Sequence, residues 1–216
     1  MTPTKLVLLD CDSTLSAIEG IDELGRLRGA ETYSAVEAMT REAMEGGTSM
    51  ESVFARRLDL IRPTSEELAS IGSLYIAHVE PTAKASIAQL QGEGWTVAIV
   101  SGGFTQAIRP LADYLGVTTV EAVVLKFDER GCYAGFEEDC PTARTRGKNR
   151  VAQRLTGTLA ATKTVMVGDG ASDLEVKGDV DYVIGFGRYA VREKVKAGAD
   201  AFIMSLSELP AILRLL

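Results

Sequence analysis

The sequence predicts an α/β fold, in which a doubly wound, Rossmann-like parallel sheet carries a small inserted helical domain. Short apolar runs at 6–9, 95–100 and 163–167 are typical of strands buried on both faces of a parallel sheet. From residue 81 onward such runs alternate with segments of helical periodicity, which predicts helices on both sheet faces and right-handed crossovers. Residues 16–79 contain no convincing strand, so we interpret them as a helical insertion.

Within the insertion, apolar residues recur at three- and four-residue spacing, and glycines and one proline separate the segments. Thr64 and Glu67 have the spacing of a capping box, which predicts the start of the last helix. The expected helices span 21–27, 33–44, 50–61 and 66–79. We therefore predict a helical cap, or lid, domain at 16–79 and an α/β core made of 1–15 and 80–216.

The core is expected to continue as alternating helices and strands. Two strand-like runs, 120–127 and 132–136, predict a hairpin around a Glu-Arg-Gly turn. Ser207 is expected to cap the closing helix, because Pro210 then falls in the first turn, where proline is tolerated. The other expected elements are helices at 82–91, 105–115, 147–155 and 191–196, and strands at 182–184 and 201–203.

Composition and charge exclude several classes of function. The 216 residues suffice for one substantial core and a small lobe. A net charge of -7 without a Lys/Arg cluster argues against a nucleic-acid partner. No apolar run approaches ~18 residues, and no signal-like pattern opens the chain, so we expect neither a membrane span nor secretion. Cys11, Cys132 and Cys140 are odd in number and lack metal-type spacing, which fits reduced thiols in a cytoplasmic protein.

His78 is the only histidine of the chain. A multi-histidine zinc site therefore cannot exist, and a Ser-His-Asp triad would have to use His78. The helix-like apolar neighbours of His78 indicate a structural or surface role instead. Any metal ion should then be held by oxygen atoms, which favours magnesium.

Four aspartates follow predicted buried strands. Asp10 and Asp12 come after the first strand and leave it on the same side, because side chains alternate along a strand. Asp169 follows the third strand and Asp173 lies four residues further on, so all four are expected at one sheet edge. At an effective dielectric of about 20, two like charges ~4 Å apart repel by roughly 4 kcal/mol. A Mg²⁺ ion with carboxylate ligands would resolve that conflict and attract a phosphate dianion.

Two further features offer groups that suit a phosphate. Ser101-Gly102-Gly103 ends the second strand and leads into a helix, so it presents a hydroxyl, unencumbered N–H groups and a positive helix terminus. Lys148 begins a later helix and is expected to add positive charge. Each feature alone also has a simpler interpretation, as a turn, a solvated lysine or, for the aspartates, a strand end or helix cap.

These motifs occur together in the order of a known superfamily. The segments 10–14, 101–103 and 168–173, with Lys148 between the last two, resemble the motifs of the haloacid dehalogenase superfamily. The run 12–24 and the helical insertion are similar to its phosphoserine phosphatase branch in particular. The resemblance covers nearly the whole chain, and it implies a Mg²⁺-dependent phosphatase with a haloacid dehalogenase core and an inserted cap.

The resemblance also implies a role for each motif residue. Asp10 would attack phosphorus, and Asp12 would protonate the leaving alkoxide and later take a proton from water. Ser101, Gly102 and Lys148 would hold the phosphoryl oxygens. The implied magnesium ligands are Asp10, Asp12 through its backbone carbonyl, and Asp169, with Asp173 supporting them.

In the cap, the resemblance implies that Glu19 meets the substrate's ammonium group and Arg57 its carboxylate, for which the planar guanidinium is suited. Met50 would supply apolar cover. Arg56 is an alternative to Arg57, and both Glu19 and Arg57 could equally be solvated or paired on helix surfaces. The implied substrate-binding set is completed by Gly103 and Ser172.

The reaction implied is hydrolysis of O-phospho-L-serine to L-serine and phosphate through an aspartyl-phosphate, the last step of serine biosynthesis, by a cytoplasmic monomer or homodimer. Two alternatives stay open at this point. The same core could hydrolyse another small phosphomonoester, such as a phosphosugar or a phosphoglycerate derivative. The fold could also bind a phosphorylated metabolite without turnover, although the presence of both Asp10 and Asp12 favours catalysis.

Overall fold

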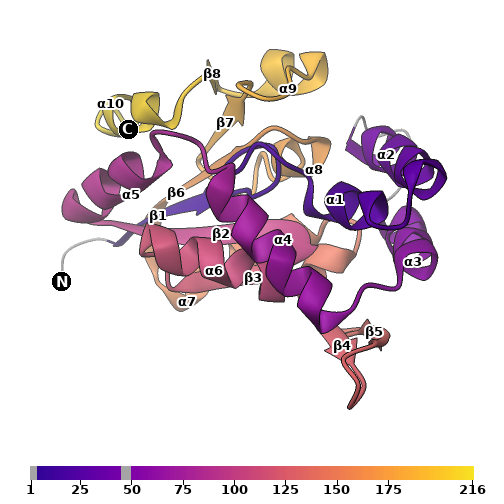
Figure 1. Ribbon diagram of the computed structural model, residues 1–216. Helices are drawn as coiled ribbons and strands as arrows, with labels where there is room; N and C mark the ends of the chain where they lie inside the picture. Colours follow the sequence, from indigo (N-terminus) through magenta and orange to yellow (C-terminus); the bar gives the residue numbers. More distant parts are fainter. Residues whose placement is uncertain (1–3, 45–49) are drawn as a thin grey trace.

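The computed structural model describes residues 4–44 and 50–216. Its centre is a six-stranded parallel sheet with the order β3-β2-β1-β6-β7-β8 (Figure 1). The order reverses beside β1, where ligand sites of doubly wound sheets are found. The predicted α/β fold is therefore confirmed. The strands are β1 (Thr4–Leu9), β2 (Trp95–Phe104), β3 (Thr119–Val123), β6 (Ala161–Gly168), β7 (Tyr182–Phe186) and β8 (Ala201–Ile203).

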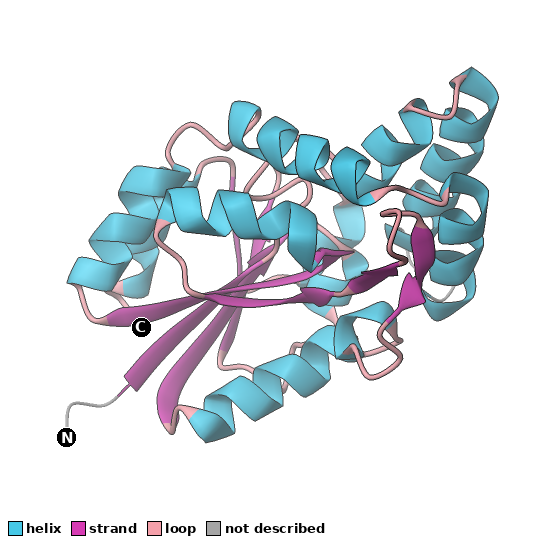
Figure 2. Ribbon diagram, turned by 60° about the horizontal axis from the view of Figure 1, so that its bottom comes forward, coloured by secondary structure: helices cyan, strands magenta, loops and turns pink. Residues whose placement is uncertain are grey.

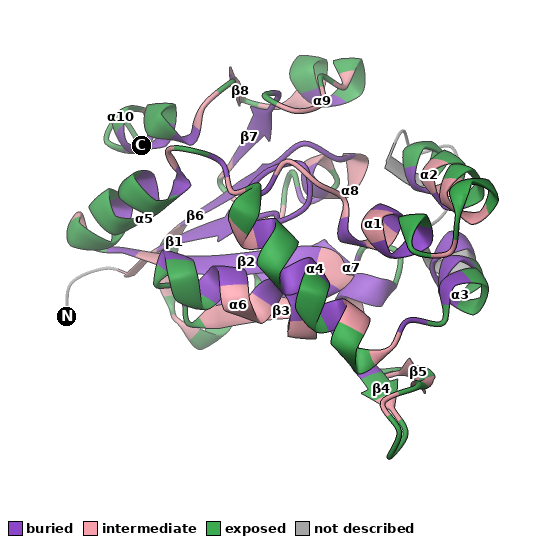
Figure 3. Cartoon of the chain, viewed as in Figure 1, coloured by how far each residue is buried: buried purple, intermediate pink, exposed green. Residues whose placement is uncertain are grey.

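Helices cover both faces of this sheet (Figure 2). Along β1, Val7 and Leu9 face the layer that contains α5 (Ala83–Gly92), α6 (Thr105–Leu115) and α10 (Leu209–Leu213). Leu6 and Leu8 face the opposite layer, which contains α7 (Gly147–Thr158), α8 (Ala171–Leu174) and α9 (Glu193–Gly198). Because both sets are fully buried, β1 is apolar at every position from residue 6 to 9 (Figure 3).

In the described part of the chain, four helices lie between β1 and α5, as the spacing of apolar residues predicts. The Thr64 side chain accepts a hydrogen bond from the Glu67 backbone N–H, and the Glu67 carboxylate accepts one from the Thr64 backbone N–H, so the predicted capping box is confirmed. The chain leaves and re-enters the sheet region through adjacent segments, because Leu15 O accepts a hydrogen bond from Glu80 N at 2.8 Å. The division into a core and a cap domain at 16–79 stays a prediction. The four helices are α1 (Gly20–Arg26), α2 (Ala30–Met44), α3 (Met50–Ile61) and α4 (Ser65–Ala77).

The fourth of these helices, α4, packs along α6 of the sheet layer. Gly72 permits this close approach, since a Cβ there would lie 3.0 Å from Pro110 Cγ and 3.2 Å from the Ala107 carbonyl oxygen. The preceding helix, α3, is joined to α4 through Arg62, which has a left-handed φ of 45°. Helix α4 is thus in contact with the sheet layer as well as with α1.

A two-stranded hairpin, β4 (Leu125–Phe127) and β5 (Tyr133–Phe136), contacts the start of α4 (Figure 1). Its turn residue Gly131 accepts a hydrogen bond from Ser65 N at 2.9 Å. On the same side, the Phe136 ring meets Phe54 of α3 edge-on, with 5.2 Å between ring centroids. The hairpin therefore braces the inserted helices from below.

Two sequence expectations need correction. The run 120–127 is not one strand, because its first part joins the main sheet as β3 and the hairpin uses Leu125–Phe127 alone. Ser207 does not cap the closing helix, because Ser205 caps the preceding 3-10 turn, Leu206–Glu208, by accepting from Ser207 N.

None of the helices in the described ranges has the length and apolar character of a membrane span.

Candidate active site

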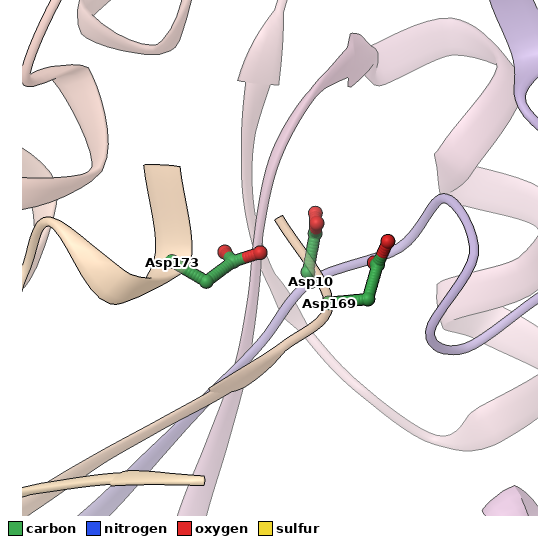
Figure 4. Close-up of side chains that lie close together, drawn as sticks. All are labelled: Asp10, Asp169 and Asp173. Carbon is green, nitrogen blue, oxygen red and sulfur yellow. The ribbon is translucent and has the colours of Figure 1, made fainter. Parts of the chain in front are cut away.

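Three acidic side chains converge above the carboxyl ends of β1 and β6. The register that places Leu9 opposite Val167 brings the next residue of each strand, Asp10 and Gly168, to the same edge. Asp169 follows directly, and Asp173 comes from α8. One oxygen from each of Asp10, Asp169 and Asp173 lies within 4.8 Å of the others (Figure 4). The structure therefore brings together the three aspartates whose side chains the sequence assigned to a metal site.

The turn after β6 is shaped so that Asp173 folds back over the strand end. Its Oδ2 accepts a hydrogen bond from Gly170 N at 3.0 Å. A Cβ at position 168 would lie 2.2 Å from Asp173 Cγ, so a residue with a side chain cannot occupy the place of Gly168 without displacing the carboxylate. The glycine of this motif is thus a packing requirement of the acidic cluster.

Lys148 neutralises part of this negative charge. Its Nζ lies 2.9 Å from Asp10 Oδ1 and 2.5 Å from Asp173 Oδ1. Burial alone would lower the pKa of Lys148, but the charges of Asp10 and Asp173 outweigh it and raise that pKa. The lysine is therefore a buried, ion-paired part of the site and not the solvated side chain of the simpler interpretation.

Asp169 has two partners that the sequence did not reveal. Thr14 Oγ1 donates to Asp169 Oδ1 at 2.8 Å, and Arg192, at the start of α9, forms an ion pair with Asp169 Oδ2. Burial raises the pKa of Asp169 to about 6, with Arg192 opposing this shift and the charge of Asp10 adding to it. The Asp169 carboxylate is thus held on both oxygens by groups of this chain.

Asp12 occupies a different environment. Its carboxyl accepts hydrogen bonds from Tyr75 Oη at 2.6 Å, Gly20 N at 2.7 Å and Ser101 Oγ at 3.2 Å. Among the described residues it has no cationic partner, and its side chain lies outside the acidic cluster. Burial raises the pKa of Asp12, and the charge of Asp10 adds to this against the three hydrogen bonds. Its predicted metal contact through the backbone carbonyl stays a prediction.

The second motif is extended backbone that continues strand β2 as far as Phe104, beyond the strand end expected at residue 101. Ser101 Oγ accepts a hydrogen bond from Gly103 N at 2.9 Å. A Cβ at Gly103 would lie 2.7 Å from Asp12 Oδ2, so the glycine lets the backbone approach that carboxylate. The motif therefore borders Asp12 directly.

Two ionisable side chains come from the inserted segment: the half-buried Glu19, just before α1, and the buried Arg57 of α3. Ser13 Oγ donates to Glu19 Oε1 at 2.6 Å, and burial, with the nearby charge of Asp12, raises the pKa of Glu19. Arg57 is 2% exposed, whereas Arg56 is exposed on the helix surface. Burial lowers the pKa of the Arg57 guanidinium. Met50 begins α3, but its side chain lies outside the described residues.

A single small cavity joins these groups. It contains the first two aspartates, the second motif, Lys148 and the two charged residues of the inserted helices. Of the two neighbouring arginines, Arg57 lines the cavity and Arg56 does not. The lining residues are Asp10, Asp12, Glu19, Ile21, Arg57, Ser101, Gly102, Gly103, Lys148 and Ser172, of which Ile21 alone was not expected.

A family model for haloacid dehalogenase-like hydrolases matches residues 7–176. The chain belongs to this family. Among curated proteins, it is similar to the phosphoserine phosphatase of Bos taurus, with 38% identity over 205 residues that span 94% of this chain and 90% of the bovine protein. The order of motifs that suggested the superfamily thus reflects common descent.

Solved structures of the family have the same fold. A phosphoserine phosphatase structure described as a phospho-aspartyl intermediate analogue matches with a TM-score of 0.85 and 28% identity, covering 98% of this chain and 99% of that one. A substrate-bound phosphoserine phosphatase complex matches with a TM-score of 0.84 and 27% identity, covering all of both chains. These haloacid dehalogenase-like hydrolases share the whole architecture described above, the inserted helices included.

Proposed function

We propose that this chain is a Mg²⁺-dependent phosphoserine phosphatase, which hydrolyses O-phospho-L-serine to L-serine and phosphate. One observation carries the proposal: one cavity is lined by two unlike carboxyl groups, Asp10 and Asp12, and by an acidic and a basic residue, Glu19 and Arg57. The first two groups suit transfer of a phosphoryl group. The second two are opposite in charge to the ammonium and carboxylate of an amino acid. Similarity to phosphoserine phosphatases over nearly the whole chain supports this assignment.

Asp10 is the nucleophile in this proposal. Its Oδ1 accepts a hydrogen bond from Cys11 N at 2.8 Å and lies 2.9 Å from Lys148 Nζ, so the carboxylate is oriented and has a cationic partner. Its Oδ2 is then the oxygen that attacks phosphorus. The new Oδ2–P bond forms as the bond between phosphorus and the substrate oxygen breaks, which leaves an aspartyl-phosphate on Asp10.

Asp12 moves the protons. In this proposal Asp12 donates a proton to the departing alkoxide of the substrate, and burial, which raises the pKa of Asp12, favours the protonated form that this step needs. The resulting carboxylate then takes a proton from the water that attacks the phosphorus of the aspartyl-phosphate. Asp10 and Asp12 thus divide the work of nucleophile and acid–base catalyst because Lys148 is the partner of Asp10 and not of Asp12.

The acidic cluster is the proposed Mg²⁺ site. Asp10 and Asp169 would bind the ion together with the backbone carbonyl of Asp12, and Asp173 would support them. A donor set made of oxygen atoms fits this hard cation, and buried carboxylates this close together require positive charge. When bound, the ion would neutralise charge on the phosphoryl oxygens. Lys148 would do the same from the opposite side.

The remaining predicted residues bind the substrate. Ser101 and the N–H of Gly102 would hold phosphoryl oxygens, and Gly103 and Ser172 complete the wall of the cavity. Glu19 would accept the ammonium group of phosphoserine, and Arg57 its carboxylate. We further propose that residues 16–79 act as a lid, because they supply Glu19 and Arg57 to a cavity whose chemistry lies on the sheet. A cytoplasmic location and a monomeric or homodimeric state stay predictions.

Phosphate release from a panel of monoesters, with and without Mg²⁺, tests the assignment. We expect the highest kcat/KM for O-phospho-L-serine and no turnover after chelation of the ion. Preference for a phosphosugar or phosphoglycerate derivative would reject the substrate but retain the chemistry. Asp10→Asn should abolish turnover without unfolding the protein, and mass spectrometry should find the phosphoryl group on Asp10 in the wild type. Activity that survives Asp10→Asn would reject the covalent mechanism.

A further inference from the structure

A chain of side-chain hydrogen bonds ties Arg57 to two residues that do not line the cavity. Arg57 NH1 donates to Thr40 Oγ1 at 3.0 Å, and Thr40 Oγ1 lies 2.6 Å from Asp22 Oδ1. The three residues come from three helices, since Asp22 is in α1, Thr40 in α2 and Arg57 in α3. Thr40 is 3% exposed and Asp22 is 9% exposed, so this connection lies inside the inserted helices.

The bonding leaves part of the Arg57 guanidinium without a protein partner. Its Nε is buried and has no hydrogen-bond acceptor among the described residues. Among the described residues, no carboxylate lies within ion-pair distance of the Arg57 guanidinium. Asp22 is linked to it only through the hydroxyl of Thr40. A buried donor on a charged group costs free energy unless a partner satisfies it. In this position the cavity, which Arg57 lines, is where that partner can come from.

The single hydroxyl between the two charges explains this arrangement. A direct, forked pair between Asp22 and Arg57 would use two N–H groups of the guanidinium and turn it away from a ligand. Thr40 instead occupies one N–H group with a neutral oxygen, while its own proton is directed to Asp22 or, at 3.0 Å, to the Val36 carbonyl oxygen. The hydrogen bond to Thr40 thereby fixes the guanidinium plane. The negative charge of Asp22 balances the Arg57 charge across the Thr40 hydroxyl, without direct contact.

We propose that Thr40 and Asp22 are positioning residues for substrate selection: they hold the Arg57 guanidinium so that its unpartnered edge receives the carboxylate of the substrate. This inference rests on the proposed phosphoserine phosphatase activity. It assigns to the hydroxyl of Thr40 a role in choosing substrates that carry a carboxylate. Neither residue touches the phosphoryl group in this arrangement, so the chemical step should not depend on them.

Thr40→Val tests the inference, because valine keeps the branched shape and removes the hydroxyl. The two substrates are O-phospho-L-serine and O-phosphoethanolamine, which has the ammonium and phosphate groups but no carboxylate. We expect KM for phosphoserine to rise about tenfold, the loss of one hydrogen bond to a charged group. KM for phosphoethanolamine should stay within about twofold of the wild-type value. kcat for both substrates should change little, because the carboxylate is bound equally in the ground state and in the transition state.

Two variants separate this role from a structural one. Thr40→Ser restores the hydroxyl and should recover most of the phosphoserine KM. Thr164→Val removes another buried threonine hydroxyl, on β6, and should alter neither KM. This hydroxyl lies 3.0 Å from Thr156 Oγ1 of α7. If Thr40→Val does not fold, Asp22→Asn serves in its place, since it keeps an acceptor oxygen and removes the charge, and it should raise KM for phosphoserine selectively.

The outcomes distinguish the inference from the function on which it rests. Equal KM changes for the two substrates, an unchanged phosphoserine KM, or no recovery in Thr40→Ser would overturn the positioning role. A wild-type enzyme that hydrolyses phosphoethanolamine as well as phosphoserine would instead reject the proposed substrate, and the role of Thr40 would fall with it.

Discussion

Removing the hydrogen bond from Tyr75 to Asp12 is the most direct test of the assignment of Asp12 as the general acid. Tyr75 is fully buried in α4, and its Oη lies 2.6 Å from Asp12 Oδ1. This bond stabilises the ionised carboxylate and therefore lowers the pKa of Asp12 against the effect of burial. Tyr75→Phe removes the donor and leaves the ring in place. A hydrogen bond to a charged group contributes roughly 1.5–3 kcal/mol, so the pKa of Asp12 should rise by about 1–2 units.

The assay is the pH dependence of kcat/KM for phosphoserine. Formation of the aspartyl-phosphate requires protonated Asp12, so kcat/KM falls as pH rises through the pKa of Asp12. In Tyr75→Phe this fall should begin about 1–2 pH units higher. Tyr182→Phe, which loses an exposed hydroxyl bonded to the Asp200 carbonyl oxygen, is the matched control and should leave the profile unchanged. An alkaline limb that stays in place, or moves to lower pH, would refute the role of Asp12 as acid.

Three more predictions follow from the charged groups. Arg57→Ala should raise KM for phosphoserine far more than KM for phosphoethanolamine, and equal effects in steady-state kinetics would remove Arg57 from carboxylate recognition. Burial raises the pKa of Asp22 to about 6, so the folded state binds its proton more tightly than the unfolded chain and stability falls as pH rises from about 4 to 6. Urea unfolding of wild type and Asp22→Asn across this range should show wild type losing ~2–3 kcal/mol relative to the variant, and parallel curves would contradict the shift. Arg192→Gln should raise the affinity for Mg²⁺ by roughly tenfold in calorimetric titrations, because the ion no longer competes with a guanidinium for Asp169, and weaker binding would argue against that competition.

The buried strands were predictable because their burial on both faces leaves a local signature. The segment 6–9 is apolar at each position, and it forms the central strand. The segment 120–127 shows where such reasoning ends. Its apolar run continues across two strands of different sheets, with Val123 in the main sheet and Leu125 in the hairpin. Pairing with β2, which is distant in the sequence, and with β5, across the hairpin turn, decides where the run divides.

The catalytic groups were predictable for a related reason. Residues that follow parallel strands meet at one edge, so Asp10 and Asp169 could be placed together from the sequence alone. Tyr75 could not be found, since it lies on the apolar face of a helix and resembles any core residue until its hydroxyl is seen beside Asp12. Arg192 gave no signal either, because it is one of many exposed-looking basic residues until the fold brings it to Asp169.

The contacts of α4 indicate which helices of the insertion could move if it acts as a lid. This helix packs along α6, and its first residue is hydrogen-bonded to the hairpin at Gly131. We therefore expect α4 to stay with the sheet domain if the insertion moves. The helices before it, α1 to α3, carry Glu19 at their entrance and Arg57. If these helices act as a lid, the lid would turn about Arg62, where the backbone is left-handed, and about the loop that leads from β1 into α1. Opening would then withdraw Arg57 from the cavity and Gly20 N from Asp12, while Tyr75 stays beside Asp12, so an arriving substrate would meet an acid that is already in place.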